Sequence, residues 1–220
     1  MLSTNWPAPA KVNLFLHITG RRPDGYHSLQ TVFQFIDLID KLDFRILDSD
    51  TVTRSSNLID VAVEDDLVVR AARSLKEHAG SKLGVDISVN KIIPTGGGLG
   101  GGSSNAATTL VALNELWQCG LSSNELAAIG LSLGADVPIF VHGYAAWAEG
   151  VGEELTAIEP EECIYLLIHP GCSVATASVF NAEDLTRNTP PITIRDFLDR
   201  GGRNDCESVV QKHYKEVANA

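Results

Sequence analysis

A glycine-rich run near the middle of the chain constrains its folding more than any other stretch. Residues 94–107 read PTGGGLGGGSSNAA, and six of the seven positions from Gly96 to Gly102 are glycine. Because glycine loses more backbone freedom on folding than any other residue, ordering such a run is costly. We therefore expect a site here at which a binding partner must approach the main chain without side chains in the way.

Two common explanations of such a run fit poorly. A flexible linker is disfavoured because a strand is expected just before the run and a helix directly after it. Gly96 to Gly101 match the dinucleotide fingerprint G-x-G-x-x-G, but so dense a run matches by chance, and residues 92–95 separate it from its strand. A Walker A loop is excluded because position 103, where its lysine belongs, is serine.

A phosphate cradle explains the run best. Glycines let backbone N–H groups approach an anion closely, and the N-terminus of the following helix carries a partial positive charge. Ser103 and Ser104 add hydroxyl donors at the start of that helix. The sequence therefore predicts a polyphosphate ligand such as ATP.

The rest of the chain mixes strands and helices without strict alternation, which favours the α+β class. Apolar residues recurring at every second position, or short apolar runs, predict strands at 12–19, 31–38, 42–47, 85–89, 139–142 and 164–168. Helical periodicity and capping signals predict helices at 66–78, 104–118, 122–133 and 204–220. A cluster of charge and proline at 159–162 marks a domain boundary.

Composition excludes several classes of protein. The chain has 220 residues, 44% of them hydrophobic, which is enough for a sizeable core. Its net charge of −11 argues against a general nucleic-acid binder or a peripheral membrane protein. No secretory signal, no membrane span and no metal-binding pattern of cysteine or histidine is evident, so we expect a cytoplasmic protein that holds no metal by such a motif.

Two isolated charges stand out, although each has an ordinary explanation. Lys11 is the only charged side chain among the first 20 residues, and it is either a solvated lysine at a strand end or a cation held in a cleft. Asp136, in the loop LGADVP, is either a turn aspartate that caps its own backbone or a rigidly held proton acceptor.

Taken together, these stretches resemble the GHMP small-molecule kinases. The order is a lysine on an N-terminal strand, then PTGGGLGGGSSNAA, then LGADVP. The resemblance is sharpest to the branch of that family that acts on 4-diphosphocytidyl-2-C-methyl-D-erythritol. It is carried by PAPAKVNLFLHITGRRPDGYHSLQT, by GADVPIFVHGYAAWAEGVGEEL, and by HPG at 169–171 and RNTP at 187–190.

The resemblance implies a fold and a reaction. The fold would have a ribosomal protein S5 domain 2-like, ATP-binding N-terminal domain at 1–158 and an incomplete ferredoxin-like C-terminal domain at 159–220. The reaction would be transfer of the ATP γ-phosphate, with Mg²⁺, to the 2-hydroxyl of the methylerythritol unit in non-mevalonate isoprenoid synthesis. The partners would be this small molecule, not a nucleic acid or a membrane, and the protein would be a monomer or a homodimer.

The resemblance also assigns roles to single residues. Asp136 would be the catalytic base and Lys11 its charge partner, and Lys91 would lie near the adenine and ribose. The residues that would hold the ATP phosphates are Pro94, Gly96, Gly97, Gly98, Leu99, Gly100, Gly101, Gly102, Ser103, Ser104 and Asn105. The residues that would contact the substrate are Asn13, Tyr26, His27, Val151, Thr176 and Phe180.

Two features depart from the family pattern. Asp66 stands where the family commonly has asparagine, which bears on the usual adenine contact. The third glycine-rich motif of the family does not occur in the 220 residues, so we expect an unfinished second domain. A nucleotide-binding remnant without catalysis and a different GHMP kinase are therefore alternatives, and the triplet GYH at 25–27 disfavours the latter.

Overall fold

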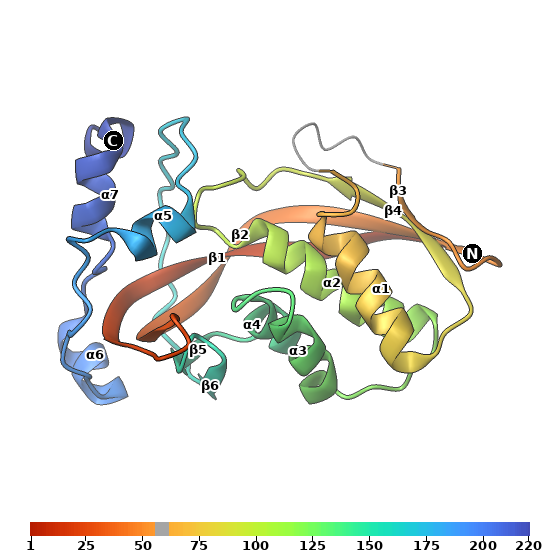
Figure 1. Cartoon of the computed structure of the whole chain (residues 1–220), viewed down its shortest axis with the longest axis horizontal. Coiled ribbons are helices and arrows are strands. Elements are labelled where there is room, and N and C mark those ends of the chain that lie inside the picture. The colour runs from red at the N-terminus through yellow and green to blue at the C-terminus, as the bar shows by residue number, and fades with distance from the viewer. Residues whose placement is uncertain (56–61) are drawn as a thin grey trace. The chain divides into compact units, whose positions relative to one another are not determined.

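The computed structural model describes residues 1–55 and 62–220, and it has the mixed α+β content expected from the sequence (Figure 1). The chain forms two compact units that interleave along the sequence. Unit 1 comprises residues 1–10, 37–93 and 100–143, and unit 2 comprises residues 11–36, 94–99 and 144–220. Strands β1 (Leu2–Arg21) and β2 (His27–Leu47) contribute residues to both units. The expected domain boundary at residue 158 stays a prediction.

Unit 1 packs helices against a small sheet. The C-terminal half of β2 pairs antiparallel with β4 (Gly84–Asn90), and β3 (Val52–Arg54) pairs parallel with β4 on its other side. The helices are α1 (Leu67–Ala79), α2 (Gly101–Leu116), α3 (Ser123–Leu131) and α4 (Val137–His142). Figure 1 shows α1 and α2 side by side. Their apolar faces form one core with Leu42, Phe44 and Ile87 of the sheet.

Local signals account for the ends of these helices. Asp66 is the N-cap of α1 and accepts a hydrogen bond from the Val68 N–H, and Gly80 ends the helix in the left-handed conformation. The capping box expected at Ser122 is present, because Ser122 and Glu125 satisfy each other's backbone N–H groups. Both helices therefore begin where the sequence predicts.

Unit 2 is built on the hairpin end of β1 and β2. The N-terminal half of β2 pairs with β5 (Ala146–Glu149), which pairs with β6 (Glu154–Ala157). Four short helices follow: α5 (Thr176–Asn181), α6 (Ile194–Arg200), α7 (Glu207–His213) and α8 (Lys215–Ala218). Phe15 anchors one core cluster by stacking on Phe197, with ring centroids 5.0 Å apart, and Ile18 anchors another with Val179 and Val209.

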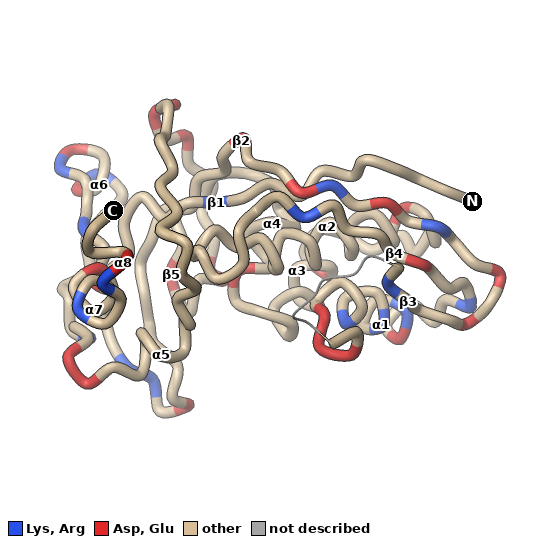
Figure 2. Tube along the Cα trace, turned by 90° about the horizontal axis from the view of Figure 1, so that it is seen from above, with Lys and Arg blue, Asp and Glu red and all other residues tan. Residues whose placement is uncertain are grey.

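Basic and acidic residues lie close together in each of the two units. Figure 2 shows blue and red segments interspersed around α1 and again around α7. Arg73 of α1 pairs with Glu64, and Lys212 of α7 pairs with Asp184. Within 1–55 and 62–220, none of the helices combines the length and the apolar character needed to cross a membrane.

Two expectations about secondary structure were right in type but not in extent, and two were wrong. The strands expected at 31–38 and 42–47 form one continuous strand, β2, and the helix expected at 204–220 is divided into α7 and α8. Residues 139–142 belong to helix α4, because Pro138 occupies its first turn, where proline is favoured, and a four-residue apolar run cannot distinguish a strand from a buried helix. Residues 164–168 form no strand and are largely exposed, since an apolar run becomes a strand only when another strand pairs with it.

Candidate active site

The glycine run adopts a backbone that only glycine tolerates well. Gly96, Gly98 and Gly100 have φ angles of 74°, 73° and 69°, in the left-handed region, and the residues between them do not. Left-handed residues that alternate with residues of negative φ can turn backbone N–H groups toward one side and so form an anion-binding concavity. Helix α2 begins at Gly101, directly after the last of these glycines. This local geometry is compatible with the expected phosphate cradle, which stays a prediction.

A buried carboxylate in unit 1 holds the chain on both sides of this loop. Asp40, on β2, is fully buried. It accepts hydrogen bonds from the Ile92 N–H (2.6 Å), the Ile93 N–H (2.8 Å) and Asn105 Nδ2 (2.9 Å). Lys91 Nζ also donates to it and forms an ion pair. Because residues 91–93 lead into the loop and Asn105 lies in the first turns of α2, Asp40 sets the positions of both ends of the loop.

Backbone contacts in unit 2 hold the middle of the loop. The Lys11 N–H donates to the Leu99 carbonyl (3.0 Å), and the Val174 N–H donates to the Gly96 carbonyl (3.1 Å). A Cβ at position 96 would lie 1.9 Å from Ser173 Oγ, so no side chain fits there. The loop is therefore tied to β1 and to the segment that precedes α5.

The start of α2 is closely packed. A Cβ at Gly101 would lie 2.6 Å from Lys91 Nζ and 2.9 Å from Ile93 Cγ2, so the close approach of this turn requires glycine. Ser103 is half-buried, whereas Ser104 is fully buried, with no hydrogen-bond partner for its Oγ among the described residues. Ser103 is therefore the serine better placed to meet a ligand, and Asn105 Nδ2 is engaged by Asp40.

Lys11 and Asn13 lie together, as their spacing along one strand predicts. Lys11 is 5% exposed, and its Nζ donates to Asn13 Oδ1 (2.7 Å) and lies 5.3 Å from the centroid of the Phe33 ring. Asn13 Nδ2 in turn donates to Thr31 Oγ1 (2.8 Å). This network holds a cation and an amide in fixed orientations on β1, inside unit 2.

Asp136 lies at the start of α4 in unit 1. It occupies the N-cap position, with φ −84° and ψ −9°, but its side chain makes no capping hydrogen bond. The turn interpretation, in which the side chain caps its own backbone, is therefore not what the structure has. A half-buried carboxylate that does not cap its own helix is suited to interactions beyond that helix.

The residues expected to bind the base gather in unit 2. The His27 ring is 8% exposed and lies 5.4 Å from the Phe180 ring, measured between centroids, at an interplanar angle of 44°. Tyr26, next to His27, is 63% exposed, which is unusual for so large a ring. Thr176 is exposed on the first turn of α5, four residues before Phe180 and on the same face. Val151 is half-buried, and its N–H donates to Glu153.

No local signal in the sequence points to two residues that hold expected site residues in place, Asp40 in unit 1 and Arg187 in unit 2. Asp40 was not considered, because an aspartate within an expected strand region carries no distinctive signal. Arg187 was noticed only as part of RNTP, yet its guanidinium donates to the His27 ring and to three backbone carbonyls. Both act on partners far away in the sequence, which local patterns do not reveal.

The aspartate at position 66, where the family commonly has asparagine, has a local explanation. Besides capping α1, the Asp66 carboxylate pairs with Arg54, and both side chains are almost completely buried. The added negative charge is therefore neutralised inside unit 1 by a cation from β3. Among residues 1–55 and 62–220, no group of three or more His, Cys, Asp or Glu side chains is arranged to hold a metal ion.

Comparisons with known proteins give close matches over nearly the whole chain. Residues 66–144 match the family described as GHMP kinases N terminal domain. The chain is 57% identical over 215 residues to a 4-diphosphocytidyl-2-C-methyl-D-erythritol kinase of Vibrio cholerae serotype O1, a match that covers 98% of this chain and 74% of the relative. It is 58% identical over 218 residues to the kinase of that name from Alkalilimnicola ehrlichii, covering 99% of this chain and 75% of the relative.

Solved structures agree with these sequence matches. A crystal structure of 4-(cytidine 5'-diphospho)-2C-methyl-D-erythritol kinase matches with a TM-score of 0.78 and 34% identity, covering 100% of this chain and 80% of the other. A homoserine kinase from Cytophaga hutchinsonii matches with a TM-score of 0.56 and 17% identity, covering 86% of this chain and 61% of the other, and this match supports the fold alone.

Proposed function

The chain belongs to the 4-diphosphocytidyl-2-C-methyl-D-erythritol kinase family of GHMP kinases, and we propose that it transfers the γ-phosphate of ATP to the 2-hydroxyl of that substrate. The products are ADP and the 2-phosphate, an intermediate on the non-mevalonate route to isoprenoids. The observation that carries the phosphate-binding part of the proposal is the series of left-handed glycines that ends directly at the N-terminus of α2.

ATP binding rests on the loop and the helix that follows it. The N–H groups of residues 96–102 and the N-terminal dipole of α2 are suited to the negative charge of the phosphates. Lys91, half-buried and paired with Asp40, is the proposed contact to the adenosine part. Mg²⁺ neutralises the phosphates in such transfers. Since Mg²⁺ commonly keeps several waters and binds through substrate phosphates, we propose that it enters with ATP rather than in a protein cage.

The chemical step needs a base and a cation. The 2-hydroxyl is a tertiary alcohol and a poor nucleophile, so a positioned carboxylate that accepts its proton lowers the barrier as the new O–P bond forms. We assign this role to Asp136, whose side chain does not cap its helix. Lys11, a buried ammonium held by Asn13, balances the charge that develops on the oxygen. The bond between the γ-phosphorus and the bridging oxygen breaks, and ADP leaves.

The cytidine end of the substrate is assigned to unit 2. The rings of Tyr26, His27 and Phe180 offer aromatic surface and a ring nitrogen to a planar base. Asn13 is assigned to the erythritol, with Thr176 and Val151 as further contacts. We propose a cytoplasmic enzyme, because ATP is its phosphate donor, and a monomer or homodimer.

The test is release of ADP by the purified protein with ATP, Mg²⁺ and 4-diphosphocytidyl-2-C-methyl-D-erythritol. We expect ADP that depends on the substrate, and none with galactose, homoserine or mevalonate in its place. ADP release with one of these other alcohols would indicate a different GHMP kinase. Binding of ATP without any substrate-dependent ADP would indicate a nucleotide-binding remnant and would refute the proposed activity.

A further inference from the structure

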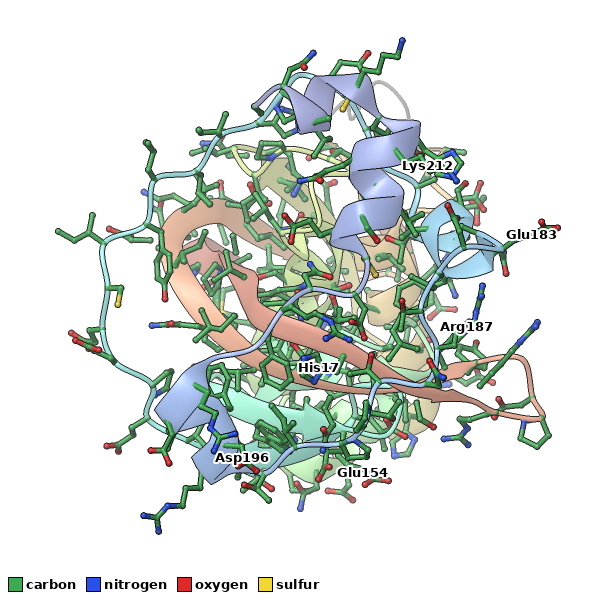
Figure 3. The ribbon with its side chains drawn as sticks, turned by 90° about the vertical axis from the view of Figure 1, so that its left-hand side faces the viewer. His17, Glu154, Glu183, Arg187, Asp196 and Lys212 are labelled. Atoms are coloured by element: carbon green, nitrogen blue, oxygen red, sulfur yellow. The ribbon has the colours of Figure 1, made fainter. Side chains whose placement is uncertain are left out.

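Arg187 joins two parts of the proposed base-binding region with one side chain. It lies after α5, on the stretch that leads toward the hairpin end of β1 and β2 (Figure 3). Its Nε donates to His27 Nε2 (3.0 Å). Its Nη1 donates to the Leu185 carbonyl (3.1 Å), and its Nη2 donates to the carbonyls of Phe180 (3.0 Å) and Ala182 (2.6 Å). The guanidinium thus connects the His27 ring to the end of the helix that carries the Phe180 ring.

The hydrogen bond to His27 determines where the imidazole proton lies. A guanidinium is always protonated and has donors only, so the His27 Nε2 that faces it must be the acceptor. The single proton of the neutral ring then lies on Nδ1. His27 therefore presents an N–H donor at Nδ1 and no free acceptor on its ring.

Burial and the positive charges around His27 both disfavour its protonation. Burial lowers the pKa of His27 below its ordinary value, and the positive charges of Arg187, after α5, and Arg21, on β1, lower it further. A neutral ring with a single donor distinguishes the bases that occur in nucleotides. Cytosine has an acceptor at N3, whereas uracil has an N–H donor there, so an N–H group that meets N3 favours cytosine.

We propose that Arg187 is a positioning residue for base selection, which holds His27 as the Nδ1–H tautomer beside Phe180 so that the site accepts cytosine and rejects uracil. This inference rests on the proposed function, because it assumes that the base lies against these rings. Arg187 acts through His27 and through the end of α5, without touching the reacting atoms.

The first measurement is the ¹⁵N spectrum of the histidine rings, with His27 assigned by its loss in His27→Gln. We expect a protonated-type shift for Nδ1 and an unprotonated-type shift for Nε2, both disturbed in Arg187→Gln. A proton on Nε2 in the wild-type protein would overturn the proposal. This spectrum needs no turnover, so it tests the tautomer even if the chain releases no ADP.

The second measurement is the affinity for CDP and for UDP by calorimetry at pH 8 and pH 6. A lost hydrogen bond to a charged group costs about 1.5–3 kcal/mol, so the preference for CDP should fall at least about tenfold in Arg187→Gln. The pKa of His27 should rise once the neighbouring positive charge is removed. A protonated ring carries an N–H at Nδ1 whichever tautomer the neutral ring adopts, so the variant should regain part of its preference for CDP between pH 8 and pH 6, whereas the wild type should change less.

The matched control is Arg203→Gln, which removes another arginine of unit 2 that donates to Asp205 and Thr189 but not to His27. It should keep the wild-type preference for CDP, and both variants should melt cooperatively. If Arg187→Gln kept the CDP preference and the pH profile of the wild type, or lost them only as much as Arg203→Gln, the proposal would be wrong. A wild type that releases no ADP but prefers CDP would refute the proposed kinase activity and support this inference.

Discussion

Replacing Asp40 with alanine should destabilise unit 1 and loosen the glycine loop. The carboxylate is fully buried and accepts from two backbone N–H groups, one amide and one ammonium. Without it, these donors lose their acceptor in a site that water does not reach freely. The side chain of Lys91 is 20% exposed, so its ammonium can recover part of its hydration.

The expected loss of stability is set by the hydrogen bonds and the ion pair that disappear, less the hydration that Lys91 recovers. Breaking a buried ion pair by removing one partner costs about 3–5 kcal/mol, and we take this figure for the whole cluster rather than adding the bonds separately. For a chain of this size, each kcal/mol lowers the melting temperature by roughly 2–4 °C, so a fall on the order of 10 °C is expected for Asp40→Ala. Asp40→Asn should lie between the alanine variant and the wild type, because its amide oxygen can still accept from Ile92 and Ile93.

The assay is thermal melting, followed by calorimetric binding of ATP at a temperature where all variants are folded. Asp37→Ala is the control, since Asp37 is an exposed carboxylate on the same strand, and it should change the free energy of unfolding by less than about 0.5 kcal/mol. ATP affinity should fall in Asp40→Ala and not in Asp37→Ala. A melting temperature for Asp40→Ala within about 2 °C of the wild type would show that Asp40 does not stabilise unit 1 in this way.

Three further perturbations test other parts of the site. Asp136→Asn should abolish substrate-dependent ADP release while ATP still binds, and an equal loss of ATP affinity would count against its role as base. Gly100→Val should weaken ATP binding at least about tenfold, because a β-branched residue is strained at φ 69°, and unchanged affinity would contradict the phosphate cradle. Burial tends to raise the pKa of Asp205, but hydrogen bonds from Thr189, the Ile18 N–H and Arg203 outweigh it, so the folded-state pKa lies below its ordinary value. The stability that Asp205 contributes is therefore present above about pH 4 and is lost as the pH falls further, so below pH 4 the wild type should lose more stability in acid melts than Asp205→Asn.

The sequence predicted a structural feature correctly where the residues that cause this feature lie within a few positions of each other. The capping box at Ser122 and the N-cap at Asp66 depend on neighbours two or three positions away, and both are present. Lys11 and Asn13 share one side of β1 because side chains alternate along a strand. The same reasoning was wrong for 139–142 and 164–168, because a short apolar run becomes a helix or a strand only according to what packs against it.

The glycine loop, the helix after it and the family can be read from neighbouring residues, because backbone freedom, caps and motif order are local properties. The buried groups that hold the loop and the rings in place are selected by the fold. Asp40 meets Lys91 and Asn105 across 51 and 65 residues, and Arg187 meets His27 across 160. A buried polar group must find a partner wherever the fold places one, so the topology of the chain, not its local pattern, selects these pairs.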